Sequence, residues 1–170
     1  TGTTGVALLQ ATFDLVTASN AKSVTDDLTR KGIALSFPGA ATFTTICGAS
    51  AIACFNPLGT SRFPGTPVPP PYIYFNPAYA GEDPAVLATV LIHEGTHFQQ
   101  YLDLALFDPS KTVGDNELRA FWNASAYWQT VRESLLPIDT ALEQEAEIAY
   151  AAAVQGEATL RALIRAVYGS

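Results

Sequence analysis

Two histidines and a glutamate in one short run are the residues of this sequence best suited to chemistry. The run His93-Glu94-Gly95-Thr96-His97 has the spacing HExxH, and the 170-residue chain contains no other histidine. On an α-helix, residues four apart project from the same face and are about 6 Å apart along the axis. The two imidazoles can therefore converge on one Zn²⁺ ion, and we expect both to be metal ligands.

Glu94 lies between the two expected ligands and points partly aside from them. A carboxylate there can hold a water molecule beside the metal without itself binding the ion. Zinc lowers the pKa of such a water towards neutrality, and the carboxylate can accept its proton. We therefore expect Glu94 to be a general base. In the alternative interpretation the histidines are ordinary core or surface residues, which leaves unexplained why the chain's two histidines have this spacing.

A catalytic zinc site also needs a third protein ligand and an open position for water. Asp103 follows His97 by six residues, the spacing of the extended motif HExxHxxGxxH/D. That motif needs a glycine where the helix must break, and position 100 is Gln. We therefore interpret Asp103 as a solvated helix residue.

Glu117 is the stronger candidate for the third ligand. It follows His97 by 20 residues, enough for one helix to end near Asp108-Pro109 and for another to return alongside. A carboxylate at the head of a buried stripe is unfavourable unless it is paired or bound to metal. The alternative is an ordinary first-turn Glu stabilised by the helix dipole. The stripe that Glu117 heads at helical spacing comprises Phe121, Ala124, Trp128, Val131 and Leu135.

HEGTH, followed 20 residues later by Asn116-Glu117, resembles the gluzincins, the thermolysin-like peptidases with two His and one Glu on zinc. The resemblance covers roughly residues 72–135. It implies a zincin-like fold and hydrolysis of peptide bonds through a metal-activated water, with Zn²⁺ as cofactor and a peptide or protein as substrate. It also implies that the strand YIYF, at 72–75, pairs with an extended substrate.

Two features depart from that family. Phe121 occupies the position at which thermolysin-type enzymes carry an Asp that orients the first histidine, and no third histidine exists to steady the transition state. An oxyanion needs a donor in addition to zinc. Tyr127, Tyr150 and Arg119 are candidates for this donor, and a tyrosine from one of the later helices is favoured, although packing at the core or surface explains each of them individually better.

The elements that must position these residues follow an α+β order. Amphipathic patterns predict helices over 5–20 and 23–32, with Asn20 and Ser23 as caps for the second. Short β-branched and aromatic runs predict strands within 33–37, 41–46, 51–55 and 72–75. Further helices are expected from Pro84 to about 106, over 116–136, from Pro137 to about 154, and up to Tyr168. We expect one domain over 1–170, with helices and a small sheet in 1–83 and a helical part carrying the metal site in 84–170.

Composition limits the classes of partner. Hydrophobic residues make up 48% of the chain and charged residues 15%, with a net charge of −7. Nucleic acids and anionic membrane surfaces are disfavoured, because both require clustered Lys and Arg. No apolar stretch reaches membrane-spanning length. We expect a monomer.

Cys47 and Cys54, seven residues apart, are either two small buried hydrophobes or a disulfide in an exported protein. The second interpretation predicts a secreted or cell-surface location. Two other functions stay open beside peptide hydrolysis. One is a non-catalytic partner-binding domain on a zincin scaffold, and the other is zinc hydrolysis of a non-peptide substrate.

Overall fold

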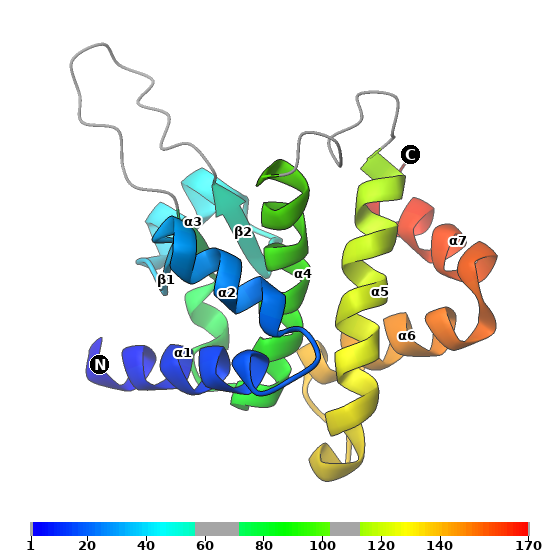
Figure 1. Cartoon of the computed structure of the whole chain (residues 1–170), viewed down its shortest axis with the longest axis horizontal. Coiled ribbons are helices and arrows are strands. Elements are labelled where there is room, and N and C mark those ends of the chain that lie inside the picture. Colours follow the sequence, from blue (N-terminus) through cyan, green and yellow to red (C-terminus); the bar gives the residue numbers. More distant parts are fainter. Residues whose placement is uncertain (1, 57–71, 103–112, 170) are drawn as a thin grey trace.

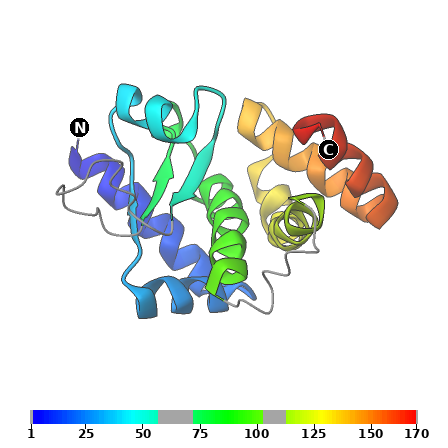
Figure 2. The ribbon, with the colours of Figure 1, turned by 90° about the horizontal axis from the view of Figure 1, so that it is seen from above.

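The helix that carries both histidines lies between two groups of elements (Figures 1 and 2). The fold is taken from a computed structural model, which describes residues 2–56, 72–102 and 113–169. In chain order its elements are α1 (Gly2–Thr17), α2 (Lys22–Lys31), β1 (Ala34–Ser36), α3 (Ala40–Cys47), β2 (Ala53–Asn56), β3 (Tyr72–Phe75), η1 (Pro77–Tyr79), α4 (Pro84–Leu102), α5 (Val113–Val131), η2 (Arg132–Leu135), α6 (Ala141–Gln155) and α7 (Glu157–Tyr168).

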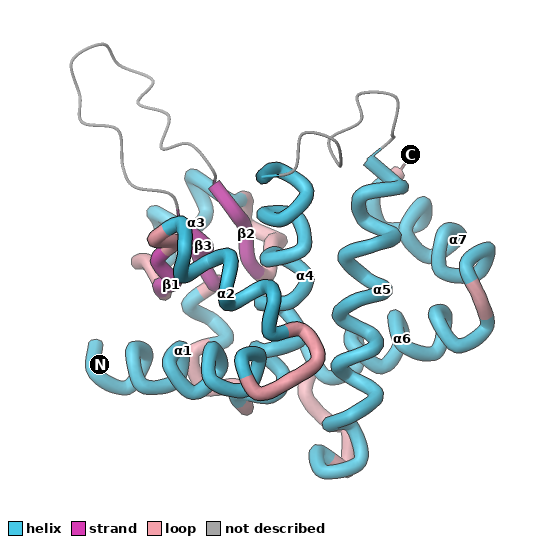
Figure 3. Tube along the Cα trace, viewed as in Figure 1, coloured by secondary structure: helices cyan, strands magenta, loops and turns pink. Residues whose placement is uncertain are grey.

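This order is mostly helical with one small sheet (Figure 3), which confirms the α+β class. Its relation to the zincin fold stays a prediction. None of the helices in the described ranges is long and apolar enough to cross a membrane.

The helix α4 is buried on nearly every side. The Asp83 side chain accepts a hydrogen bond from the Ala85 N–H at 2.8 Å, and Pro84 occupies the first turn, as the sequence predicts. On one side α4 packs against α1, α2 and β2, and on the other against α5. The main core surrounds it, with Leu87, Leu91 and Trp128 fully buried. A helix that is apolar almost all round belongs at the centre of a domain.

The sheet has the order β1-β3-β2, with β1 parallel and β2 antiparallel to β3. The expected pairing of a substrate with residues 72–75 is therefore wrong, because Ala34–Ser36 and Ala53–Asn56 already flank that strand. Among the described strands β1 and β2 lie at the two edges, and β2 packs against α4.

The run at 41–46 is helical, and the predicted strand there is wrong. It forms most of α3, whose first turn is closed by the Phe43 N–H and the Gly39 carbonyl at 2.9 Å. Phe43 is buried at 1% exposure. A helix that buries this one apolar side chain suits the core better than a strand that would bury every second residue. Packing of this kind overrides the strand propensity of Thr and Ile.

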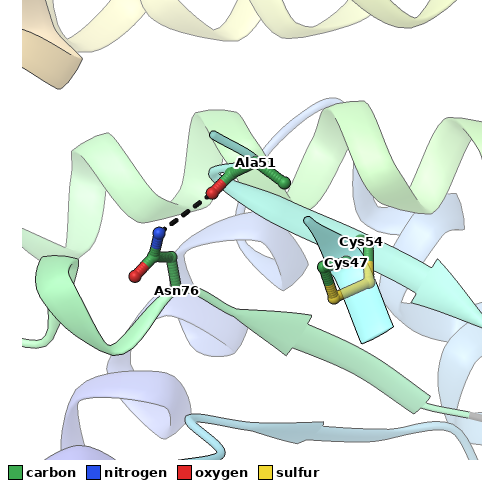
Figure 4. The surroundings of a disulfide bond; sticks show 4 residues. All are labelled: Cys47, Ala51, Cys54 and Asn76. Carbon is green, nitrogen blue, oxygen red and sulfur yellow. Dashed lines mark hydrogen bonds between the residues drawn. A yellow bond between two sulfur atoms is a disulfide. The ribbon is translucent and has the colours of Figure 1, made fainter. Parts of the chain in front are cut away.

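A disulfide joins the end of α3 to β2, between Cys47 and Cys54 (Figure 4). Beside it, the Asn76 side-chain N–H donates to the Ala51 carbonyl at 3.0 Å, which fastens the chain after β3 to the chain before β2. The two contacts hold β2 in place next to α4.

At the N-terminus, Leu9 and Val16 are buried but Val6 is 69% exposed, so the apolar residues of α1 face the core only in part. The helix α2 ends at Gly32 in the left-handed conformation, as expected. The residue preceding its first turn is Ala21, without a side-chain cap, so the expected caps at Asn20 and Ser23 are wrong.

At the C-terminal end, α6 begins at Ala141, later than the predicted start at Pro137. Thr140 and Glu143 form a capping box there, which sets the start of the helix. The helix α7 packs against α5 and α6, and ends at Tyr168 as expected.

Candidate metal centre

The structure brings His93, His97 and Glu117 together at the interface between α4 and α5. One turn of α4 separates the histidines, and their Nε2 atoms lie 3.2 Å apart. The Glu117 carboxylate comes from the first turns of α5 and closes the group. His93 Nε2 is 3.2 Å from Glu117 Oε2, and His97 Nε2 is 3.3 Å from Oε1. The ligand atoms of all three residues lie within 4.8 Å of one another, so the group could hold a metal ion.

The environment of Glu117 suits a metal ligand. Burial acts to raise the pKa of its carboxyl, but the close contacts with His93 and His97 outweigh burial and lower the pKa to about 2. The Oε2 atom is buried with no hydrogen-bond partner among the described residues, and His93 Nε2 lies 3.2 Å from it. A buried anionic oxygen without a donor is unfavourable, and a cation at this point would satisfy it.

The site is partly open. The side chains of His93, His97 and Glu117 are 14%, 23% and 12% exposed. Each side chain therefore keeps a small solvent-exposed part, although the Glu117 Oε2 atom itself is buried.

His97 is held from behind by Gln100. The His97 Nδ1 atom lies 3.0 Å from Gln100 Oε1, on the opposite side of the ring from Nε2. Burial acts to lower the pKa of His97, but its contacts with Glu117, Glu94 and Gln100 outweigh this effect and raise it. The ring therefore directs Nε2 towards the expected metal position, while Nδ1 contacts Gln100.

His93 is held by packing against an aromatic ring. The Phe121 ring meets it edge to face, with centroids 4.6 Å apart and an interplanar angle of 76°. The sequence places Phe121 where the resemblance implies an Asp, and the structure shows that this residue still contacts the first histidine. Van der Waals contact, rather than a charged hydrogen bond, limits the rotation of the imidazole.

Glu94 reaches towards the edge strand. Its carboxylate accepts a hydrogen bond from the backbone N–H of Phe55 in β2. Burial is the main cause that raises the pKa of Glu94 above its usual range, and Glu117 adds to it, while the two histidines and the Phe55 N–H act in the opposite direction. The structure thus puts the predicted base between the metal group and β2.

Tyr168 is a site residue that sequence reasoning missed. It is the last residue of α7, and its hydroxyl hydrogen-bonds to Glu117. Its ring lies 6.3 Å from that of Phe121, at 65°. Burial, and the nearby carboxylates of Glu117 and Glu94, raise its pKa, so the phenol keeps its proton at neutral pH. The sequence pattern over residues 93–117 could not indicate that Tyr168, 51 positions after Glu117, lies at the site.

The donors suggested by the sequence lie elsewhere. Tyr127 is buried in the main core, at 7% exposure, and burial together with the charge of Asp83 raises its pKa. The Arg132 guanidinium lies over the Tyr150 ring, with its Cζ atom 4.9 Å from the ring centroid. Arg119 is exposed. Asp103, the rejected alternative to Glu117, lies outside the described residues.

Comparison with known proteins adds no identification to this geometry. The chain matches no protein-family model, no curated protein and no solved structure.

Proposed function

We propose that this protein is a zinc-dependent hydrolase of peptide bonds, with His93, His97 and Glu117 as the zinc ligands and Glu94 as the general base. The observation that carries the proposal is the spacing of the ligand atoms. Bonds of about 2.0–2.1 Å to a tetrahedral zinc ion require ligand atoms about 3.3–3.4 Å apart. Here the two Nε2 atoms lie 3.2 Å apart, and Glu117 faces each histidine with a different oxygen, Oε2 at 3.2 Å from His93 Nε2 and Oε1 at 3.3 Å from His97 Nε2.

If His93, His97 and Glu117 hold zinc, the metal would supply a Lewis acid that lowers the pKa of a water molecule and polarises a carbonyl. The remaining work belongs to the chain. Glu94 is next to a ligand in sequence but is absent from the ligand group, so its carboxylate is free to accept a proton from the attacking water. A structural zinc site would not require such a carboxylate.

The Tyr168 hydroxyl supplies the donor for the negative charge that develops on the substrate oxygen. The hydroxyl hydrogen-bonds to Glu117, and because its pKa is raised it keeps its proton at neutral pH. A preorganised donor of this kind stabilises the transition state more than the ground state. Because Tyr168 is 46% exposed, a substrate can reach it.

The edge strand β2 is the natural support for an extended peptide. It has no partner on its outer side among the described strands, and its Phe55 N–H contacts the Glu94 carboxylate. A peptide paired with β2 would therefore run beside the general base. This assignment replaces the pairing with residues 72–75 that the sequence suggested.

Substitution of the base tests the proposal without removing the metal. Glu94→Gln keeps the size of the side chain but cannot accept a proton at neutral pH. We expect it to retain zinc and thermal stability while cleavage of a mixed peptide library falls by about 10²–10⁴-fold. The matched control is Glu133→Gln, an exposed residue of η2, which leaves cleavage unchanged. Equal cleavage by wild type and Glu94→Gln contradicts the role of Glu94. Zinc-loaded wild type that cleaves neither peptides nor protein substrates favours a non-catalytic binding domain.

A further inference from the structure

Gln100 is a buried polar residue at the junction of the two helices that supply the ligands. It lies three residues after His97 on α4 and is 6% exposed. A buried side-chain amide is unfavourable unless its oxygen and nitrogen are both hydrogen-bonded. Here both ends have partners, and the two partners belong to different helices.

The oxygen end of the amide faces His97. Gln100 Oε1 lies 3.0 Å from His97 Nδ1. If His97 binds a metal through Nε2, the neutral ring carries its proton on Nδ1, which makes Nδ1 a donor. Gln100 Oε1 is then the acceptor that fixes both the tautomer and the orientation of the ring.

The nitrogen end faces α5. Gln100 Nε2 donates to the Asn116 backbone carbonyl at 3.1 Å. A carbonyl can only accept, so this contact assigns the nitrogen of the amide to the α5 side and the oxygen to the His97 side. The two contacts therefore agree on one amide orientation. Asn116 immediately precedes Glu117, so the amide links one ligand to the turn that carries another.

We propose that Gln100 is the positioning residue of the metal centre, holding His97 by its oxygen and the first turn of α5 by its nitrogen. The inference rests on the proposed metal site but not on the reaction. His93 is oriented by packing against Phe121, and His97 by the side-chain amide of Gln100.

The neighbouring glutamine provides a matched control. Gln99 has the same side chain on the same helix, and its Nε2 donates to Asp27 Oδ2 at 3.0 Å and to Ser23 Oγ at 3.3 Å. Both partners belong to α2, away from the metal group. Replacing Gln99 by Met therefore removes an interhelical amide contact without touching a ligand.

The test compares the zinc affinity of Gln100→Met and Gln99→Met, measured by competition with a chromophoric chelator. Loss of such an outer partner typically weakens metal binding by about 10–100-fold. We expect that loss for Gln100→Met and wild-type affinity for Gln99→Met. In nitrogen-15 NMR spectra of the zinc-loaded chain, the His97 Nδ1–H proton should be slow to exchange in wild type and in Gln99→Met. It should be lost from the spectrum of Gln100→Met.

A third variant guards against an effect of packing alone. Gln100→Glu keeps an acceptor for His97 Nδ1 but loses the donor to Asn116, so we expect it to recover the protected Nδ1–H proton and most of the zinc affinity. Three outcomes overturn the inference: wild-type affinity in Gln100→Met, an equal loss in Gln99→Met, or a wild type that binds no zinc. A wild type that binds zinc but cleaves no peptide defeats the proposed function, while the comparison of the glutamine variants still decides the role of Gln100.

Discussion

The glycine inside the motif HEGTH is explained by its neighbour on α2. A Cβ atom built on Gly95 would lie 2.2 Å from Val24 Cγ1, far closer than any real contact. Gly95 and Val24 are both buried, and α2 packs directly on α4. A glycine between the two histidines thus lets the two helices approach one another.

We expect Gly95→Ala to lower the free energy of unfolding by about 1–3 kcal/mol, the usual effect of adding a methyl group to a filled core. Denaturant unfolding measures it. Gly81→Ala is the control, because a Cβ there meets no atom within 4 Å. Equal stability of the two variants would show that α2 and α4 are not closely packed at this point.

Tyr168→Phe tests the proposed donor. Removal of one donor to a developing oxyanion typically lowers kcat by about 10²–10³-fold. We expect a loss of this size with unchanged zinc content, since the hydroxyl is not one of the ligands. Tyr150→Phe, whose ring packs under Arg132, should keep its kcat. A normal kcat in Tyr168→Phe would remove this residue from the mechanism.

At the residue level, the sequence was informative where the chemistry is local. In HExxH, the four-residue spacing of the histidines places both on one face of a helix. The apolar stripe that follows Glu117 identifies the face of the second helix that packs against them. Tyr168 could not be found in this way. Its contact with Glu117 depends on how α7 folds back onto α5, which no periodicity within either helix encodes.

Among the elements, α5 and α6 are joined through Glu147. Its carboxylate accepts a hydrogen bond from the Trp128 indole N–H at 2.8 Å and from the Arg132 guanidinium. The hydrogen bond from Arg132 is the main cause that lowers the pKa of Glu147 below its ordinary value, and Trp128 contributes as well. Because Trp128 is fully buried, its N–H depends on this acceptor.

We expect Glu147→Ala to lower the free energy of unfolding at pH 7 by about 1–3 kcal/mol, the effect of leaving a buried donor unsatisfied. A carboxyl with a lowered pKa in the folded state stabilises the fold above its ordinary pKa of about 4.3, and that contribution is lost as the pH falls through the folded value. The gap between wild type and Glu147→Ala should therefore narrow below about pH 4.

Urea unfolding at several pH values measures this gap, with exposed Glu145→Ala of the same helix as the control. A gap that stays constant down to strongly acidic pH would contradict the charged contact with Arg132.

The long helices were predictable because each carries a sustained apolar face and clear boundaries, such as Asp83-Pro84 at the start of α4 and Gly156 before α7. The short elements were not. Four to eight residues give too little pattern to separate the helix at α3 from a strand. Strand order in the sheet is set by tertiary pairing, so the sequence pattern could not predict that β3 is the central strand.

In the whole molecule, the metal group lies where two bodies of structure meet. The helices α1 and α2 and the sheet pack on one side of α4, while α5 to α7 form the other side (Figure 2). Two ligands come from α4 and one from α5. A metal bound here would therefore clamp the two sides together, in addition to its role in the proposed reaction.

The most direct test of the account is the metal content of three purified forms of the chain after dialysis against metal-free buffer. We predict one zinc per chain in wild type, almost none in Glu117→Ala, and the wild-type content in Asp103→Ala. Loss of a ligand removes most of the binding free energy, whereas Asp103 is not expected to touch the ion. Zinc retained by Glu117→Ala but lost from Asp103→Ala, or a wild type without zinc, would contradict the proposed metal centre.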